Sequence, residues 1–159
     1  MTTLEQYYQN GILTGSQEPF ARIVPEYDES DGEDAVKILN IGGLIVDEWQ
    51  ENVLCDWMGR TGEGVWSSPT CGLSVPRQNG KTLDTCGRIA AGMIMYSEWV
   101  VYTAHLQKTA TETFMELKGL FESPKLYKYV KEIKSALGRE QIILKNGARV
   151  QFVARTRNG

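Results

Sequence analysis

Hydrophobic and polar positions along this chain recur at spacings that predict alternating helices and strands. Apolar residues return every three or four positions in three segments, which predicts amphipathic helices over residues 47–58, 82–97 and 105–122. Short apolar runs predict a strand at 71–75 and a buried strand at 99–104. Residues 141–144 and 149–153, on either side of Asn146-Gly147, are typical of a β-hairpin.

The other segments are less regular. Residues 1–10 suggest a short helix, residues 36–46 are strand-like around Gly42-Gly43, and residues 127–135 suggest one or two helical turns. We expect an N-terminal arm with an acidic loop over residues 1–35 and one α/β domain over residues 36–159, with helices on both faces of its sheet. No further central strand follows the hairpin, so we expect the domain to be incomplete at its C-terminus.

The composition is that of a globular protein, with 159 residues of which 42% are hydrophobic. The N-terminus lacks the basic start and apolar core of a signal peptide, and no apolar run approaches the ~18 residues of a membrane span, so we expect an intracellular protein. The three cysteines, Cys55, Cys71 and Cys86, match neither a disulfide framework nor a zinc pattern. We therefore expect reduced and mostly buried thiols.

Charge divides the chain into two unlike halves. Residues 1–70 hold 13 acidic and 3 basic side chains, whereas residues 71–159 hold 7 acidic and 14 basic ones, although the net charge of the whole chain is only −3. The small total argues against a general nucleic-acid coat, but a basic half suits a polyanionic partner. A solvated helix face explains many of these lysines equally well.

A phosphate-binding loop is indicated by the run Val75-Pro76-Arg77-Gln78-Asn79-Gly80-Lys81-Thr82, between the strand-like and helix-like segments. In such loops backbone N–H groups hold phosphate oxygens, and the following helix adds its positive N-terminal end. Lys81 would reach the β- and γ-phosphates of a nucleotide, and the Thr82 hydroxyl would bind Mg²⁺. The run departs from G-x-x-x-x-G-K-[ST] at Val75, where the first glycine belongs.

Several side chains near this loop have two readings each. Arg77 could stabilise charge on the γ-phosphate, or it could pair with a carboxylate or a DNA phosphate. Gln78 and Asn79 suit a tight turn in which their N–H groups matter more than their side chains. Gln50 could cap the helix that begins near Asp47, or its amide could read the adenine edge, in which case the neighbouring Trp49 is a core or base-stacking residue.

A catalytic carboxylate is hard to place, because after Lys81 no apolar strand ends in Asp-Glu. The run Leu44-Ile45-Val46-Asp47-Glu48 would supply one only in a permuted topology, and a helix cap at Asp47 is the better reading. Other polar groups can be interpreted either as ordinary surface residues or as residues that contact a ligand or a nucleic acid. They are His105, Arg155, Arg157 and the group Lys125, Tyr127, Lys128, Tyr129, Lys131 and Lys134.

Taken together, these residues resemble the large terminase subunit of tailed bacteriophages, the motor that packages DNA. The resemblance covers residues ~40–159 and rests on the loop 75–82 combined with Trp49-Gln50 on an upstream helix. Tyr102-Thr103-Ala104-His105 and the closing run 154–159 are also similar to that family. Each motif alone would be a weak signal.

The resemblance implies a P-loop NTPase fold that binds ATP and Mg²⁺ through Pro76, Arg77, Gln78, Asn79, Gly80, Lys81 and Thr82. It favours adenine recognition by Gln50 and a γ-phosphate role for Arg77. In that family an acidic strand motif and a nuclease domain follow the segment matching Arg155–Gly159, so we expect this chain to bind ATP weakly and to hydrolyse it negligibly.

The whole motor would work in the cytoplasm of a bacterial host and transiently at the procapsid portal. It would form a homo-oligomeric ring on the portal ring, with a small terminase subunit and duplex DNA as partners. Two other classes of protein stay open: a non-catalytic nucleotide-binding module, and a different P-loop enzyme such as a helicase-like ATPase or a small-molecule kinase.

Overall fold

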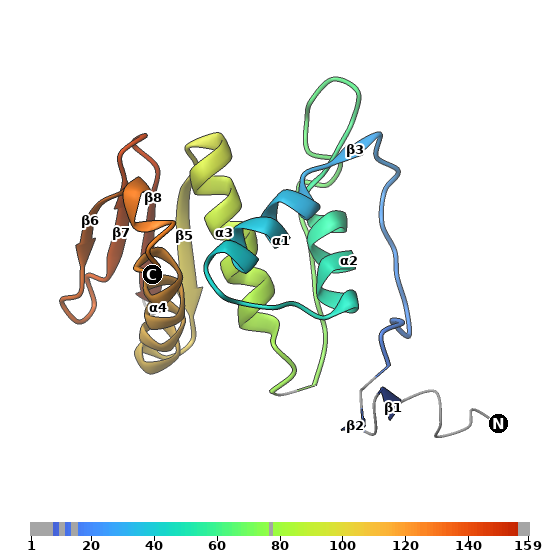
Figure 1. The fold of residues 1–159 in the computed structure, drawn as a ribbon, viewed down its shortest axis with the longest axis horizontal. Coiled ribbons are helices and arrows are strands. Elements are labelled where there is room, and N and C mark those ends of the chain that lie inside the picture. Colours follow the sequence, from blue (N-terminus) through green and yellow to red (C-terminus); the bar gives the residue numbers. More distant parts are fainter. Residues whose placement is uncertain (1–7, 10–11, 14–15, 77, 156–159) are drawn as a thin grey trace.

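The computed structural model describes residues 8–9, 12–13, 16–76 and 78–155. Its helices and strands follow the chain in the order β1 (Tyr8–Gln9), β2 (Ile12–Leu13), β3 (Glu29–Ser30), α1 (Gly32–Ile41), α2 (Glu48–Trp57), β4 (Gly59–Arg60), α3 (Lys81–Tyr96), β5 (Trp99–Ala104), α4 (Gln107–Phe121), the 3₁₀ helix η2 (Tyr127–Tyr129), β6 (Val130–Lys134), β7 (Gln141–Leu144) and β8 (Arg149–Ala154). Figure 1 shows this arrangement. None of the described helices is both long enough and apolar enough to cross a membrane.

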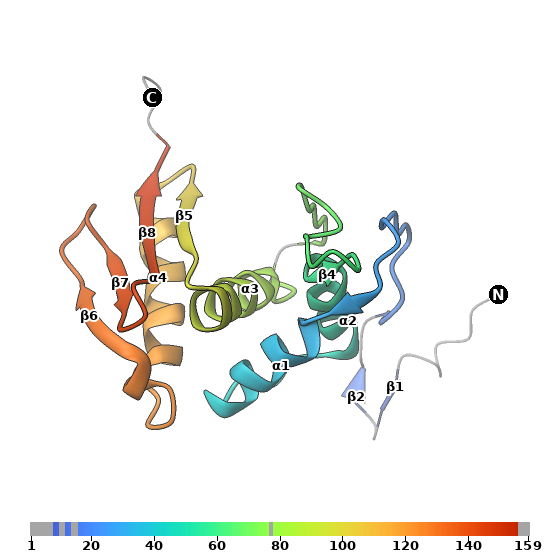
Figure 2. The same cartoon turned by 90° about the horizontal axis from the view of Figure 1, so that it is seen from above.

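The main sheet has four strands in the order β5-β8-β7-β6. β5 runs parallel to β8, with Trp99 opposite Arg149 and Ala104 opposite Ala154, whereas β8, β7 and β6 pair antiparallel. The predicted hairpin is confirmed as β7 and β8. The helices α1, α2 and α3 group beside the β5 end of the sheet (Figures 1 and 2), so the chain is a mixed α/β protein with a mixed sheet flanked by helices.

The three predicted helices are confirmed as α2, α3 and α4, and their apolar stripes form the core. Gly87 of α3 lies so close to α1 and α2 that a Cβ atom there would be 2.8 Å from Leu39 and 3.3 Å from Leu54. On the other side of the core, the ring of Phe114 from α4 packs edge-on against Phe152 of β8, with 5.4 Å between centroids. The buried face of α3 therefore packs against α1 and α2, and that of α4 packs against the sheet.

Two segments near the N-terminus differ from their predicted structure. Residues 36–46, predicted as strand-like, belong largely to α1, because Ala35, Ile38 and Leu39 are buried at helical spacing and acidic residues fill the first turn, where the helix dipole favours them. The predicted helix over residues 1–10 is wrong at Tyr8–Gln9, which pair with β2 as a strand. Residues 1–7 and 10 lie outside the described part of the chain.

Two further predictions, for residues 71–75 and 127–135, are wrong because a strand forms only where a neighbouring strand pairs with it. Residues 71–75 form no strand: among the described residues no β-bridge includes them, and Cys71, Gly72 and Ser74 are exposed. Residues 127–135, predicted as helical turns, form η2 and then β6, which pairs antiparallel with β7. This pairing gives β6 hydrogen-bond partners along one side, whereas residues 71–75 have no neighbouring strand in the described part of the chain.

The prediction of a sheet covered on both faces is also wrong for the described residues. Residues of β5 and β8 alternate between the two faces, and those on the face away from α4 are exposed. Trp99 is 70% exposed and Val101 is 63% exposed, so β5 is not the buried strand that its apolar sequence predicted. Only the face that carries Phe152 packs against α4.

Candidate functional site

The predicted phosphate loop lies on the surface, at the start of α3. Gln78, Asn79 and Gly80 are all exposed, so the bend is open to solvent and to an anion. Figure 1 shows α3 running opposite to β5, so that the start of the helix and the end of the strand lie at the same end of the molecule. Ligands of α/β proteins commonly bind at this end, beyond the carboxyl ends of parallel strands.

The backbone of the loop has the geometry of an anion-binding turn. Gln78 and Gly80 adopt left-handed conformations with φ of 64° and 77°. Residue 78 lies in a hydrogen-bonded turn that the Asn79 N–H closes, whereas the N–H groups of Gly80 and Thr82 donate to no oxygen atom of the described residues. The Gly80 carbonyl accepts from Leu83 at 2.9 Å. Free N–H groups at the positive end of a helix are suited to phosphate oxygens.

Lys81 holds its ammonium group over the beginning of the loop. Its Nζ atom donates to the carbonyl oxygens of Val75 at 2.9 Å and Pro76 at 2.7 Å. Hydrogen bonds to charged phosphate oxygens are stronger than bonds to neutral carbonyls, so a triphosphate would compete well for this ammonium group. The neighbouring Thr82 is half-buried at the same helix start.

Gln50 joins the start of α2 to the phosphate loop. Its side-chain oxygen accepts from the Asp47 N–H at 2.8 Å, as the helix-cap reading requires, and its Nε2 donates to the Gly80 carbonyl at 3.2 Å. The side chain is only 4% exposed. Trp49 beside it is half-buried, and the backbone N–H of Trp49 donates to the side-chain oxygen of Gln17. The bond to Gly80 is not visible in the sequence, because it joins residues 30 positions apart.

Asp84 is a buried carboxylate one turn into α3 that sequence reasoning missed. The residue is fully buried, and both carboxylate oxygens lack a hydrogen-bond partner among the described residues. Burial raises the pKa of Asp84 from 3.8 to about 7. An Asp two residues after a Gly-Lys-Thr helix start is typical of a solvated first-turn acid, so only the packing of α3 reveals this group.

The remaining predicted site residues are spread more widely. Arg77 and Arg157 lie outside the described residues. Arg155 is exposed beyond the end of β8, where its N–H donates to the Ala104 carbonyl at 2.7 Å. His105 is exposed just after β5. The ends of β5 and β8 thus bring His105 and Arg155 close together in the fold, at the end of the sheet where α3 begins.

The run Leu44-Ile45-Val46-Asp47-Glu48 does not act as an acidic strand. Residues 44–47 form no strand, and Asp47 is the N-cap of α2 within a capping box completed by Gln50. The permuted topology is therefore wrong, and the cap reading is confirmed. Among the described residues, no cluster of three or more His, Cys, Asp or Glu side chains is arranged to hold a metal ion.

The interleaved tyrosines and lysines lie on η2, on β6 and, for Lys125, in the turn before η2, at one edge of the sheet. The four lysines of the group are exposed, and the Nζ atom of Lys128 lies 4.9 Å from the ring centroid of Tyr129. The amphipathic-helix explanation for this group is wrong, because β6 is a strand. Lysines on an edge strand discourage pairing with another chain, which explains them without a nucleic acid.

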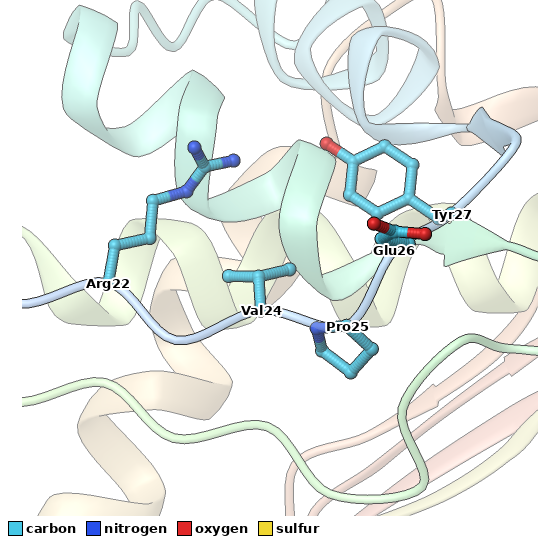
Figure 3. Close-up of a pocket in the computed structure, with 5 residues that line it drawn as sticks. All are labelled: Arg22, Val24, Pro25, Glu26 and Tyr27. Atoms are coloured by element: carbon cyan, nitrogen blue, oxygen red, sulfur yellow. The ribbon is translucent and has the colours of Figure 1, made fainter.

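A shallow hollow of about 360 Å³ lies far along α2 from the phosphate loop. Its lining comes from Arg22, Val24, Pro25, Glu26 and Tyr27, and Figure 3 shows Arg22 and Tyr27 extending toward α2. Both donate to the carboxylate of Asp56, near the C-terminal end of α2, and the Arg22 guanidinium makes two hydrogen bonds to it, of 2.7 and 2.6 Å. That carboxylate raises the pKa of Arg22. The hollow is therefore a by-product of anchoring the arm.

The fold and the loop define a mixed α/β protein with an exposed, helix-terminal turn suited to an anion. Comparison with known proteins adds no relative, since no family model, no curated protein and no solved structure matches this chain. The functional interpretation therefore depends on the geometry around α3 and on the motifs of the sequence.

Proposed function

We propose that residues 75–82 bind the triphosphate of ATP together with Mg²⁺. The observation that carries the proposal is an exposed turn at the start of a 16-residue helix, where the N–H groups of Gly80 and Thr82 donate to no oxygen of the described residues. Lys81 adds a positive charge that already bends over the same turn. Together these groups offer phosphate oxygens hydrogen-bond donors and a positive charge on an exposed turn.

Each group has a distinct part in the proposed complex. The N–H groups of Gly80 and Thr82 would hold oxygens of the β-phosphate, and Lys81 would leave the carbonyls of Val75 and Pro76 to bridge the β- and γ-phosphates. Thr82 supplies one oxygen ligand for Mg²⁺. The phosphates and water supply the others, which suits an ion that usually keeps several waters.

The resemblance to the large terminase subunit extends the proposal to a biological role. The chain would be the ATP-binding portion of a motor that translocates duplex DNA into a capsid, as a homo-oligomeric ring on the portal with a small subunit as partner. Support for this step comes from the loop 75–82 in combination with Trp49-Gln50. Because no apolar strand after Lys81 ends in Asp-Glu, we expect this chain to bind ATP and to hydrolyse it negligibly.

Calorimetric titration with Mg²⁺–ATP tests the proposal. Lys81→Ala should weaken binding at least about tenfold, since hydrogen bonds to charged groups contribute about 1.5–3 kcal/mol. Lys108→Ala is the matched control, because that lysine is 84% exposed on α4 and should leave the affinity unchanged. Equal affinity of the wild type and Lys81→Ala would reject the loop as the binding site.

A further inference from the structure

The side-chain amide of Gln50 makes a hydrogen bond through its oxygen and another through its nitrogen. Its oxygen accepts from the Asp47 N–H at 2.8 Å, and its nitrogen donates to the Gly80 carbonyl at 3.2 Å. The residue is 4% exposed, so breaking either bond would leave a buried polar group without a partner. One amide hydrogen and one oxygen lone pair stay unused, but the side chain is so buried that little of the amide is open to an adenine ring.

The carbonyl that accepts from this amide belongs to Gly80, a residue of the phosphate loop in the left-handed conformation. Gly80 has a φ of 77°, and a Cβ atom at this position would lie 2.8 Å from Gln50 Nε2. The Gly80 carbonyl also accepts from the Leu83 N–H, so one oxygen receives both the brace from α2 and the first turn of α3. A shift of this peptide would move the neighbouring N–H groups that face an anion.

Other contacts of the loop come mainly from the loop itself. Lys81 bonds to the carbonyls of Val75 and Pro76, within six residues of its own position. By contrast, Gln50 belongs to a separate helix, and its position is fixed by the α2 cap at Asp47. Among the described residues, Gln50 is thus the side chain that ties the loop to a second element of the fold.

We propose that Gln50 is a positioning residue that holds the Gly80 peptide in its phosphate-binding conformation, whatever base the nucleotide carries. The inference rests on the proposed function and replaces adenine recognition with bracing of the loop. Because the same amide caps α2, the brace also couples the start of α2 to the start of α3. Gln50 would act through the Gly80 carbonyl and would not touch the base.

Three probes separate bracing from base recognition: Mg²⁺–ATP, Mg²⁺–GTP and Mg²⁺–tripolyphosphate, each titrated calorimetrically. Gln50→Leu removes both bonds, and Gln50→Glu keeps an acceptor for the Asp47 N–H but no donor for Gly80. We expect both variants to bind all three probes more weakly by a similar factor of about five to ten, the usual effect of losing one buried hydrogen bond. Asp47→Ala is the control, since it weakens the α2 cap but keeps the backbone N–H that positions Gln50.

Hydrogen exchange of the Leu83 amide gives a readout that needs no ligand. Its N–H donates to the same carbonyl as Gln50, so exchange should accelerate in both Gln50 variants and change little in Asp47→Ala. Circular dichroism identifies a variant that fails to fold. In that case the titrations and the Leu83 exchange of the other Gln50 variant test the inference.

A loss confined to ATP would show that Gln50 reads adenine and would overturn the inference, as would unchanged Leu83 exchange. If the wild type bound none of the three probes, the proposed function would fail, while the exchange data would still show whether Gln50 braces the loop. The two failures are therefore distinguishable.

Discussion

Replacing the buried Asp84 with asparagine should make this protein more stable in alkaline buffer. The carboxyl group is fully buried without a hydrogen-bond partner among the described residues, and burial raises its pKa from 3.8 to about 7. Because the folded state holds this proton more tightly than the unfolded state, the stability from Asp84 is complete below about pH 4. It is lost progressively as the pH rises to about 7, and the penalty is constant above that.

The size of the effect follows from the pKa shift. A difference of about three pKa units corresponds to about 4 kcal/mol between the two protonation states. The dipole of α3 opposes this penalty, since Asp84 lies in the first turn, but such an interaction contributes only about 0.3–1 kcal/mol. Desolvation therefore dominates, and Asp84→Asn should match the wild type at or below about pH 4 and exceed its unfolding free energy by up to about 4 kcal/mol at pH 9.

Urea denaturation at pH 4, 7 and 9, followed by tryptophan fluorescence, measures this difference. Asp34→Asn is the matched control, because that carboxylate is 49% exposed on α1 in a pair with Lys37, and exposed pairs contribute at most about 1 kcal/mol. Parallel pH profiles for the wild type and Asp84→Asn would show that the carboxyl group titrates normally and would refute the reasoning.

Two other groups give separate predictions. Glu140 is 2% exposed and accepts from Thr111 at 2.7 Å, so Glu140→Ala should lower the unfolding free energy by about 1–3 kcal/mol in urea denaturation, and an unchanged midpoint would contradict the buried contact. Burial raises the pKa of Cys86 to about 12, whereas Cys71 is exposed. Iodoacetamide at pH 8 should therefore label Cys71 and spare Cys86 in the native protein, as mass spectrometry would show, and rapid labelling of Cys86 would contradict its place in the core.

Local pattern was sufficient for the elements that bury one regular face. The helices α2, α3 and α4 and the β7–β8 hairpin were predicted because their apolar spacing, cap and turn residues agree with one another. Residues 36–46 misled because Gly42-Gly43 and a cluster of Val, Ile and Leu resemble a strand. The helical spacing of Ala35, Ile38 and Leu39 becomes evident only when the preceding acidic turn is included in the helix.

Pairing and burial between distant residues were not predictable in the same way. Whether residues 71–75 form a strand depends on a neighbour, and whether β5 is buried depends on what covers its outer face. The loop residues 78–82 were identified from their motif, but the Gln50–Gly80 bond and the orphaned Asp84 arise from the packing of α2 against α3. No periodicity in the sequence records such contacts.

The central claim is that the turn at the start of α3 holds a triphosphate. Titrating the isotope-labelled protein with Mg²⁺–ATP while recording backbone amide resonances tests it most directly. The account predicts the largest shifts at the N–H groups of Gly80 and Thr82, which donate to no oxygen of the described residues. Shifts confined to another surface, such as the hollow around Arg22 and Tyr27, with those two amides unmoved, would contradict it.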